Sequence, residues 1–366
     1  MYQVLSCGSN GDYQLGQGND EDQSILKPSI FRTIENGNDH YSTTINSKPV
    51  EIACGGNHTI IRMFEGTIYS AGSNTFGQIG KPISIKNDQT FSQVKFEKKI
   101  KKIACCWESS FIITEDDEIY SIGKGLKGEL GLGKDVTETS EFKLIKKFDI
   151  PILDIQAAMN HVVVRLADGS LSGWGNCRKG QLGEIINPSL IKQGAIWEPW
   201  FLQMGTLKGN DHFGVGREFT IITVNGKPHL YGKLNNSNIE DIQSLQKIRN
   251  VKTMWSSIHF QTDDSFISFG INSHGQLFDY KPKKQFNAAH VDFETGSEHG
   301  LLLLDSEVYA WGWGEHGNCG ISKTNDTNTF NYLNPIFTND DSEASNIIYF
   351  KAGCATSWVV IEIKKK

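Results

Sequence analysis

The chain has little of what a disulfide framework, a zinc site or a membrane segment requires. Its 366 residues contain seven cysteines, and no two of them form a CxxC pair; Cys105 and Cys106 are simply adjacent. This usage fits a reducing compartment and encodes no intrinsic metal site. The longest apolar run, residues 301–304, is too short to span a bilayer, and the start MYQVLSCGSNG lacks the basic and apolar segments of a secretory signal. We therefore expect a cytoplasmic or nuclear protein that makes no membrane contact.

Positive charge is also not in excess. Lys and Arg number 36 against 42 Asp and Glu, and the formal net charge is -6. Binding to nucleic acid relies on basic surfaces that neutralise phosphates, so we do not expect tight, direct nucleic-acid binding. The hydrophobic fraction of 38% and the 37 glycines against nine prolines are compatible with an ordinary soluble globular chain.

A strand-and-turn motif of the form apolar-x-x-x-G-x(4)-G-Q-L-G recurs along the chain. Clear copies begin at Val4, Ile68, Ile119, Leu171, Phe266 and Val308, and an eroded copy begins at His229. Their first glycines, spaced by about 40 to 60 residues as propeller blades are, are Gly8, Gly72, Gly123, Gly175, Gly232, Gly270 and Gly312.

A second motif, a short apolar strand followed by a tight turn and another strand, alternates with the first. Its copies begin at Glu51, Ile103, Ile155, Gly214, Met254, Phe293 and Phe350. Two motifs per repeat predict four short strands per blade, hence an all-β, seven-bladed propeller that occupies residues 1–366 as one domain, with an ordered ring over about residues 2–363. Because the chain starts within one repeat and ends with the other half of one, strands near Val4 and Val359 should pair and close the ring.

These strings resemble a known family. GSNGDYQLGQG at Gly8 and ACGGNHT at Ala53 resemble the repeat of the regulator of chromosome condensation family. The C-terminal third is similar in particular to its fungal killer-toxin-insensitivity (alpha-tubulin suppressor) branch, through MWSSIH at Met254, SHGQLF at Ser273, TGSEHG at Thr295, YAWGWGEHGNCG at Tyr309 and GCATSW at Gly353.

The resemblance to this branch implies a non-catalytic propeller that forms a heterodimer with a small CSL-type zinc/iron protein, diphthamide-biosynthesis protein three. It also implies that the pair serves Elongator-dependent modification of wobble uridines in tRNA and the biosynthesis of diphthamide. The small partner holds the metal, so the propeller itself is expected to have no catalytic residue, no cofactor and no metal site.

Departures from the repeat point to a binding surface in the last three blades. Trp313 follows a signature glycine where the other copies have mostly polar residues, and exposed aromatic side chains are enriched at interface hot spots. A Trp that merely covers the turn of its own blade is the alternative. The predicted partner-binding patch consists of Trp255, His259, Glu298, His299, Trp313, Glu315, His316 and Trp358.

Other features have structural interpretations. His58, His161, His259 and His299 occur in the second motif, where an imidazole can hydrogen-bond a neighbouring turn, although for His299 a partner-binding role stays open. The GxGxxG strings at Gly123 and Gly312 fall on the repeat's own glycines, and no helical pattern follows them, which argues against a dinucleotide site. The string IWEPWFLQMG, with Trp197, Trp200 and Phe201, interrupts the repeat and serves either local packing or a second binding surface.

Two other functions are alternatives to a protein-binding propeller. Guanine-nucleotide exchange on a Ran-type GTPase is the activity for which the superfamily is named. An ultraviolet-sensing propeller of the plant type would need repeated GWRHT strings, and the chain has only GWGEHG. No HExxH spacing or Ser/His/Asp order supports a hydrolase.

Overall fold

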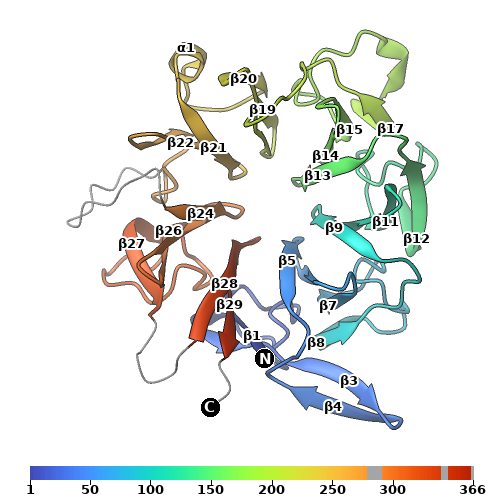
Figure 1. The fold of residues 1–366 in the computed structure, drawn as a ribbon, viewed down its shortest axis with the longest axis vertical. Coiled ribbons are helices and arrows are strands. Elements are labelled where there is room, and N and C mark those ends of the chain that lie inside the picture. The colour runs from blue at the N-terminus through green and yellow to red at the C-terminus, as the bar shows by residue number, and fades with distance from the viewer. Residues whose placement is uncertain (278–290, 339–344, 364–366) are drawn as a thin grey trace.

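Seven sheets follow one another around a ring in the computed structural model, which describes residues 1–277, 291–338 and 345–363 (Figure 1). Each inner strand contacts the inner strand of the next sheet, and a contact between the last and the first completes the ring. The predicted seven-bladed β-propeller is therefore confirmed. In the order of blades 1 to 7, the inner strands are β5 (Pro49–Cys54), β9 (Ile100–Cys105), β13 (Ile152–Ala157), β18 (Phe213–Val215), β21 (Ile248–Thr253), β24 (Asp292–Thr295) and β28 (Ser345–Ala352).

Each blade continues outward by antiparallel pairing. The second strands are β6 (His58–Met63), β10 (Ser109–Thr114), β14 (His161–Leu166), β19 (Phe219–Val224), β22 (Ser257–Thr262), β25 (His299–Leu304) and β29 (Thr356–Ile363). The third strands are β7 (Ile68–Ser73), β11 (Glu118–Lys124), β15 (Leu171–Asn176), β20 (Lys227–Gly232), β23 (Phe266–Gly270), β26 (Glu307–Trp313) and β1 (Tyr2–Gly8). Blades 1, 2, 3, 6 and 7 add β8 (Asn87–Gln93), β12 (Glu138–Lys147), β17 (Ala195–Phe201), β27 (Thr329–Phe337) and β2 (Gln23–Pro28).

The prediction of four strands in every blade is wrong. Blades 2, 6 and 7 have four, blade 1 has six, blade 3 has five, and blades 4 and 5 have three among the described residues. In blade 4 the eroded repeat is followed by the helix α1 (Ile239–Gln243), capped by the side chain of Asn238. The buried Ile242 of α1 packs in the same cluster as Phe219 and Phe260, so this helix covers the blade where an outer strand would otherwise lie. The outer strand depends on loop sequences that the repeat does not fix.

The ring closes as the sequence predicts. In blade 7, β1 from the start of the chain pairs along its whole length with β29 from the end, with Leu5 opposite Val359. In Figure 1 the dark blue β1 lies beside the dark red β29. Because β1 and β29 are joined in one sheet, the ring has no open seam between its first and last repeats.

The signature glycines are the last or second-last residues of the third strands, where the backbone of the adjacent turn comes close. Gly175 has φ +98°, and a Cβ there would lie 2.4 Å from the carbonyl oxygen of Asn160. Only glycine adopts that conformation and leaves that space without strain. Gly123, the second-last residue of β11 in blade 2, has a similar φ of +105°. The next element is the strand β12 and not a helix. The GxGxxG string at Gly123 therefore belongs to a blade rather than to a dinucleotide site.

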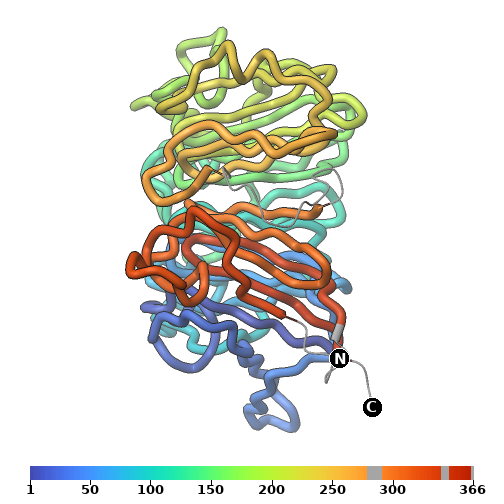
Figure 2. Tube along the Cα trace, turned by 90° about the vertical axis from the view of Figure 1, so that its left-hand side faces the viewer, coloured from blue at the N-terminus to red at the C-terminus, as the bar shows by residue number. Residues whose placement is uncertain are grey.

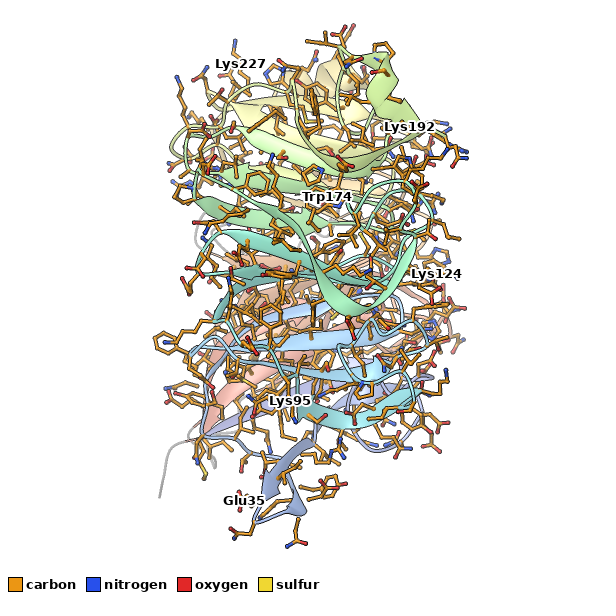
Figure 3. All side chains as sticks on the ribbon, turned by 90° about the vertical axis from the view of Figure 1, so that its right-hand side faces the viewer. Glu35, Lys95, Lys124, Trp174, Lys192 and Lys227 are labelled. Atoms are coloured by element: carbon orange, nitrogen blue, oxygen red, sulfur yellow. The ribbon has the colours of Figure 1, made fainter. Side chains whose placement is uncertain are left out.

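Apolar side chains fill the spaces between neighbouring blades. Trp174 on β15 is fully buried, lies 5.9 Å from Phe111 of blade 2 between ring centroids, and donates its indole N–H to the carbonyl of Glu129 at 2.6 Å. Figure 3 shows it within the stack of blades. In the irregular blade 3, β17 is preceded by η1 (Pro188–Leu190) and β16 (Ile191–Lys192). There Trp197 is buried and donates to the carbonyl of Lys192, which fits the local-packing interpretation of that string.

A hairpin of β3 (Phe31–Glu35) and β4 (Asn38–Ser42) enlarges blade 1 and projects beyond the ring (Figures 1 and 2). Figure 3 labels Glu35 near its tip. The repeat does not predict this hairpin, because it lies in a variable loop between two copies. Within the described part of the chain, no helix has both the length and the apolar character needed to cross a membrane.

Candidate protein-binding site

One end of the ring gathers the turns that join each inner strand to the second strand of its blade. We call this end the turn face; its turns are residues 55–57, 106–108, 158–160, 216–218, 254–256, 296–298 and 353–355. Backbone N–H groups link several turns to the next: Arg217 donates to Trp255 O (3.0 Å), Trp255 to Ser297 O (2.8 Å) and Ser297 to Gly353 O (3.0 Å). Blades 4 to 7 therefore present a continuous, hydrogen-bonded surface at this end.

A pocket of about 180 Å³ hollows the turn face where blades 4, 5 and 6 meet. We call it the aromatic pocket. Trp313, the last residue of β26, stacks on His274 with ring centroids 4.6 Å apart and planes 14° apart. Trp255 from the turn of blade 5 contributes a second indole. The lining also includes Arg217, Lys233, Gln276 and Glu298.

The indole N–H of Trp313 is buried and has no hydrogen-bond acceptor among the described residues. A buried donor left unpaired costs about 1–3 kcal/mol. The ring itself is only partly buried, so the exposed part of the indole, and not its N–H, is the part that a partner could contact.

Glu298 is one of two acidic residues that line the aromatic pocket, the other being Glu218. The carboxylate of Glu298 accepts a hydrogen bond from the hydroxyl of Ser256 at 2.6 Å. Burial raises the pKa of Glu298, while the bonds from Ser256 and Gln276 and the charge of Arg217 act in the opposite direction. The pocket thus combines two indoles, an imidazole and a partly buried carboxyl group.

The structure brings together three of the eight residues predicted for partner binding. Trp255, Glu298 and Trp313 line the aromatic pocket. Glu315 and His316 lie on the loop after Trp313 and remain at the surface, where the His316 imidazole Nδ1 is 2.8 Å from the carboxylate Oδ2 of Asp22 in the loop between β1 and β2. For these five residues partner binding stays a prediction, and His316 faces blade 7.

The other three predicted residues lie in the interior. The side chains of His259, His299 and Trp358 have no solvent exposure. His259 is held between the hydroxyls of Ser257 (2.9 Å) and Ser268 (2.8 Å), and Trp358 packs within the cluster that contains Phe91. In this fold they cannot touch a partner at the surface, so their assignment to the patch is corrected.

The structural interpretation of the histidines fits three contacts between blades. His58 Nε2 is 2.8 Å from Ser110 Oγ, His161 Nε2 is 3.2 Å from Thr220 Oγ1, and His299 Nε2 is 3.0 Å from Ser357 Oγ. Each contact joins a blade to the next one around the ring. Burial lowers the pKa of His58, His161 and His259 to about 3 and that of His299 to about 4, so these imidazoles are neutral near pH 7.

Sequence reasoning missed Trp107, an exposed residue of the turn face. Its ring lies 5.7 Å from that of Trp255 between centroids, although the two residues belong to blades 2 and 5, which are not neighbours. The indoles therefore meet across the mouth of the central channel. The signal was available, since both residues occupy the second position after the inner strand of their blades.

Sequence reasoning also missed the central channel, which holds a cavity of about 440 Å³. Its charged lining residues come from six inner strands and from β6: Glu51, Arg62, Lys102, Asp154, Lys252, Glu294 and Lys351. Burial alone would raise the pKa of Glu294, but the ammonium groups of Lys351 and Lys252 lower it to about 2.

The described residues contain no group of three or more His, Cys, Asp and Glu side chains placed to bind a metal ion. All seven cysteines have free thiols. Burial raises the pKa of the Cys7 and Cys354 thiols to about 12, which keeps both protonated at neutral pH.

Comparisons with known proteins agree with the repeat pattern. The regulator of chromosome condensation (RCC1) repeat matches residues 3–61 and 50–78. An RCC1 repeat-containing protein of Schizosaccharomyces pombe is 28% identical over 99% of this chain and 100% of its own length, and the ultraviolet-B receptor UVR8 of Arabidopsis thaliana is 26% identical over 97% and 83%. The structure of Prp20p from Saccharomyces cerevisiae, described with its binding to Gsp1p and histones, superposes with a TM-score of 0.77 at 17% identity over 100% of this chain and 92% of that one.

Proposed function

We propose that this propeller of regulator of chromosome condensation repeats is a non-catalytic platform that holds a protein partner on its turn face, through the aromatic pocket. The observation that carries the proposal is convergence. Four strings far apart in the sequence each supply one wall of the pocket: MWSSIH gives Trp255, SHGQLF gives His274, TGSEHG gives Glu298 and WGWGEHG gives Trp313. The last residue of SHGQLF, at position 278, lies outside the described residues.

For the partner we propose a small CSL-type zinc/iron protein, diphthamide-biosynthesis protein three. The support is that four of the five strings which carry the resemblance to the killer-toxin-insensitivity branch line the aromatic pocket; the fifth, GCATSW, does not. In this proposal the heterodimer works in Elongator-dependent modification of tRNA wobble uridines and in diphthamide biosynthesis, in the cytoplasm and nucleus. The partner supplies the metal chemistry, and the propeller orients it.

Replacing Trp313 and His316 together by Ala is expected to weaken binding of the zinc-loaded CSL-type protein at least thirtyfold, about 2 kcal/mol, as loss of an interface hot spot does. The measurement is isothermal titration calorimetry with the full chain. Trp200→Ala is the matched control, because it removes a Trp side chain that is 44% exposed but lies on β17 of blade 3. It should leave the affinity unchanged.

Undiminished affinity of the Trp313→Ala, His316→Ala double variant, with the fold verified by circular dichroism, would exclude the aromatic pocket as the docking site. An equal loss in Trp200→Ala would do the same. If the wild-type chain does not bind the CSL-type protein at micromolar concentrations, the proposed partner is wrong.

Guanine-nucleotide exchange on a Ran-type GTPase, the alternative from the sequence, makes a separate prediction. A nucleotide-release assay with the purified GTPase should show no acceleration by this chain if the platform proposal holds. Acceleration that survives the substitution of Trp313 and His316 would favour exchange activity at another surface of the propeller.

A further inference from the structure

The cavity in the central channel carries an unequal number of charges. Four cationic side chains line it, against three carboxylates. Two pairs are matched: Arg62 Nε lies 2.7 Å from Glu51 Oε2, and Lys102 Nζ lies 3.6 Å from Asp154 Oδ1. The excess charge therefore resides with the remaining three residues.

Those three residues form a chain across blades 5, 6 and 7. The two carboxylate oxygens of Glu294 are taken by two different ammonium groups, with Lys252 Nζ at 2.6 Å from Oε1 and Lys351 Nζ at 2.7 Å from Oε2. Glu294 lowers the free energy of both cations but neutralises only one. A partly buried cation without a full counter-charge is unfavourable, so an additional anion would stabilise this arrangement.

A hydroxyl group near Lys351 and Glu294 can serve as a hydrogen-bond donor. The Tyr349 oxygen accepts a hydrogen bond from the backbone N–H of Ile52 at 3.3 Å. Accepting this bond leaves the phenolic hydrogen to donate to a ligand in the cavity. Burial raises the pKa of the Tyr349 hydroxyl, so this group stays protonated at neutral pH. The charge of Lys351 lowers this pKa and that of Glu294 raises it, both by less than burial does.

The cavity is as large as a small-molecule site, and two indole rings cover one end of it. Its volume of about 440 Å³ falls in the usual range of ligand pockets, about 300–1,000 Å³. At the turn face, Trp107 and Trp255 line the cavity and contact each other across it. The indoles would shield a bound anion from water, and low local polarity strengthens its attraction to the lysines.

We propose that the central cavity binds a small organic carboxylate between Lys252, Lys351 and Tyr349, beneath the Trp107 and Trp255 indoles. A carboxylate fits better than a phosphate because the cavity has one excess positive charge, and phosphate brings about 1.5 to 2 negative charges at neutral pH. Such a carboxylate belongs either to a free organic acid or to the C-terminus of a peptide. This site adjoins the aromatic pocket proposed for the protein partner and shares Trp255 with it.

The test is calorimetric titration of the full chain with propionate, with N-acetyl-triglycine, with the amide of that peptide and with inorganic phosphate. We expect binding of at least one of the two monocarboxylates, and no binding of the amide. Binding of propionate alone identifies a free acid as the source, and binding of the peptide carboxylate alone identifies a chain end. Absence of carboxylate binding at millimolar concentration, or tighter binding of phosphate, overturns the proposal.

Two variants separate a ligand site from an ion network that only holds the blades together. Lys351→Met removes the excess charge and leaves Glu294 paired with Lys252, so it should weaken carboxylate binding about tenfold. Glu294→Gln removes the internal carboxylate and should tighten binding severalfold, although both variants lower the melting temperature. Lys192→Met, on the outer strand β16, is the control and should change nothing. Weaker binding in Glu294→Gln contradicts the proposal, and Trp313→Ala should leave carboxylate binding intact.

Discussion

Lowering the pH from about 7.5 to about 5 is expected to remove about 8 kcal/mol from the free energy of unfolding. The cause is the set of buried histidines, whose folded-state pKa values are about 3 for His58, His161 and His259 and about 4 for His299, against an ordinary value of 6.5 for a solvated imidazole. Below pH 6.5 the unfolded chain binds protons that the folded chain does not. Each imidazole therefore contributes about 2 kcal/mol of loss at pH 5.

Acidification lowers the stability of the folded chain only over a defined range of pH. Stability from these imidazoles is present above pH 6.5 and decreases as the pH falls toward about 4 for His299 and about 3 for the other three. Burial raises the pKa of Glu51, Glu129 and Glu298, which offsets part of the loss near the lower end, because the folded state then binds protons on these carboxyls. Since the total stability of a domain is about 5–15 kcal/mol, the propeller should lose a large part of its stability within this range.

The measurement is urea denaturation at several pH values between 7.5 and 5, followed by circular dichroism. His161→Gln is the matched variant, because the Gln amide can reach Thr220 as Nε2 does but does not titrate. It should be less stable than wild type at pH 7.5 and should lose about 2 kcal/mol less on acidification. An unchanged pH dependence in His161→Gln would refute the assignment of the acid sensitivity to the buried imidazoles.

Trp174→Ala is expected to destabilise the propeller by about 3–5 kcal/mol, the usual cost of removing a buried Trp from a core. The substitution leaves a cavity between blades 2 and 3, where Trp174 meets Phe111, and it leaves the carbonyl of Glu129 without its indole donor. The midpoint of urea denaturation at pH 7.5 measures the change.

Trp200→Ala is the control for this prediction as well. Trp200 lies only three residues beyond the buried Trp197, but its own side chain is exposed, and its loss should cost less than about 1 kcal/mol. Equal effects of the two substitutions would show that the space between blades 2 and 3 does not depend on the packing of Trp174.

The repeat predicted the features that every blade must share. The signature glycines, the alternation of two motifs and the pairing of the first and last strands all follow from backbone constraints that recur in each copy. The number of strands per blade does not, because outer strands, the β3–β4 hairpin and α1 are encoded in the variable loops. A repeat pattern therefore predicts the inner part of the ring better than its rim.

The candidate site was predictable only in part, and the errors have a physical origin. His259 and Trp358 occupy the same position of the second strand as Ile60, Phe111 and Leu301, all of which are buried between blades. Strand periodicity applied across the copies would have assigned them to the core. The channel charges had the same kind of signal, since Lys252, Glu294 and Lys351 are each the second-last residue of their inner strand.

The joining of β1 to β29 bears on how the chain acquires its structure. Tyr2 pairs with Glu362, so nearly the whole described chain separates the two partners of one sheet. During translation β1 emerges long before β29, and its edge must wait unpaired while the blades between them form. Such distant pairing slows folding, and an exposed edge invites association with other chains. Nascent copies on one messenger are thus at greatest risk of joining each other before the final strand has left the ribosome.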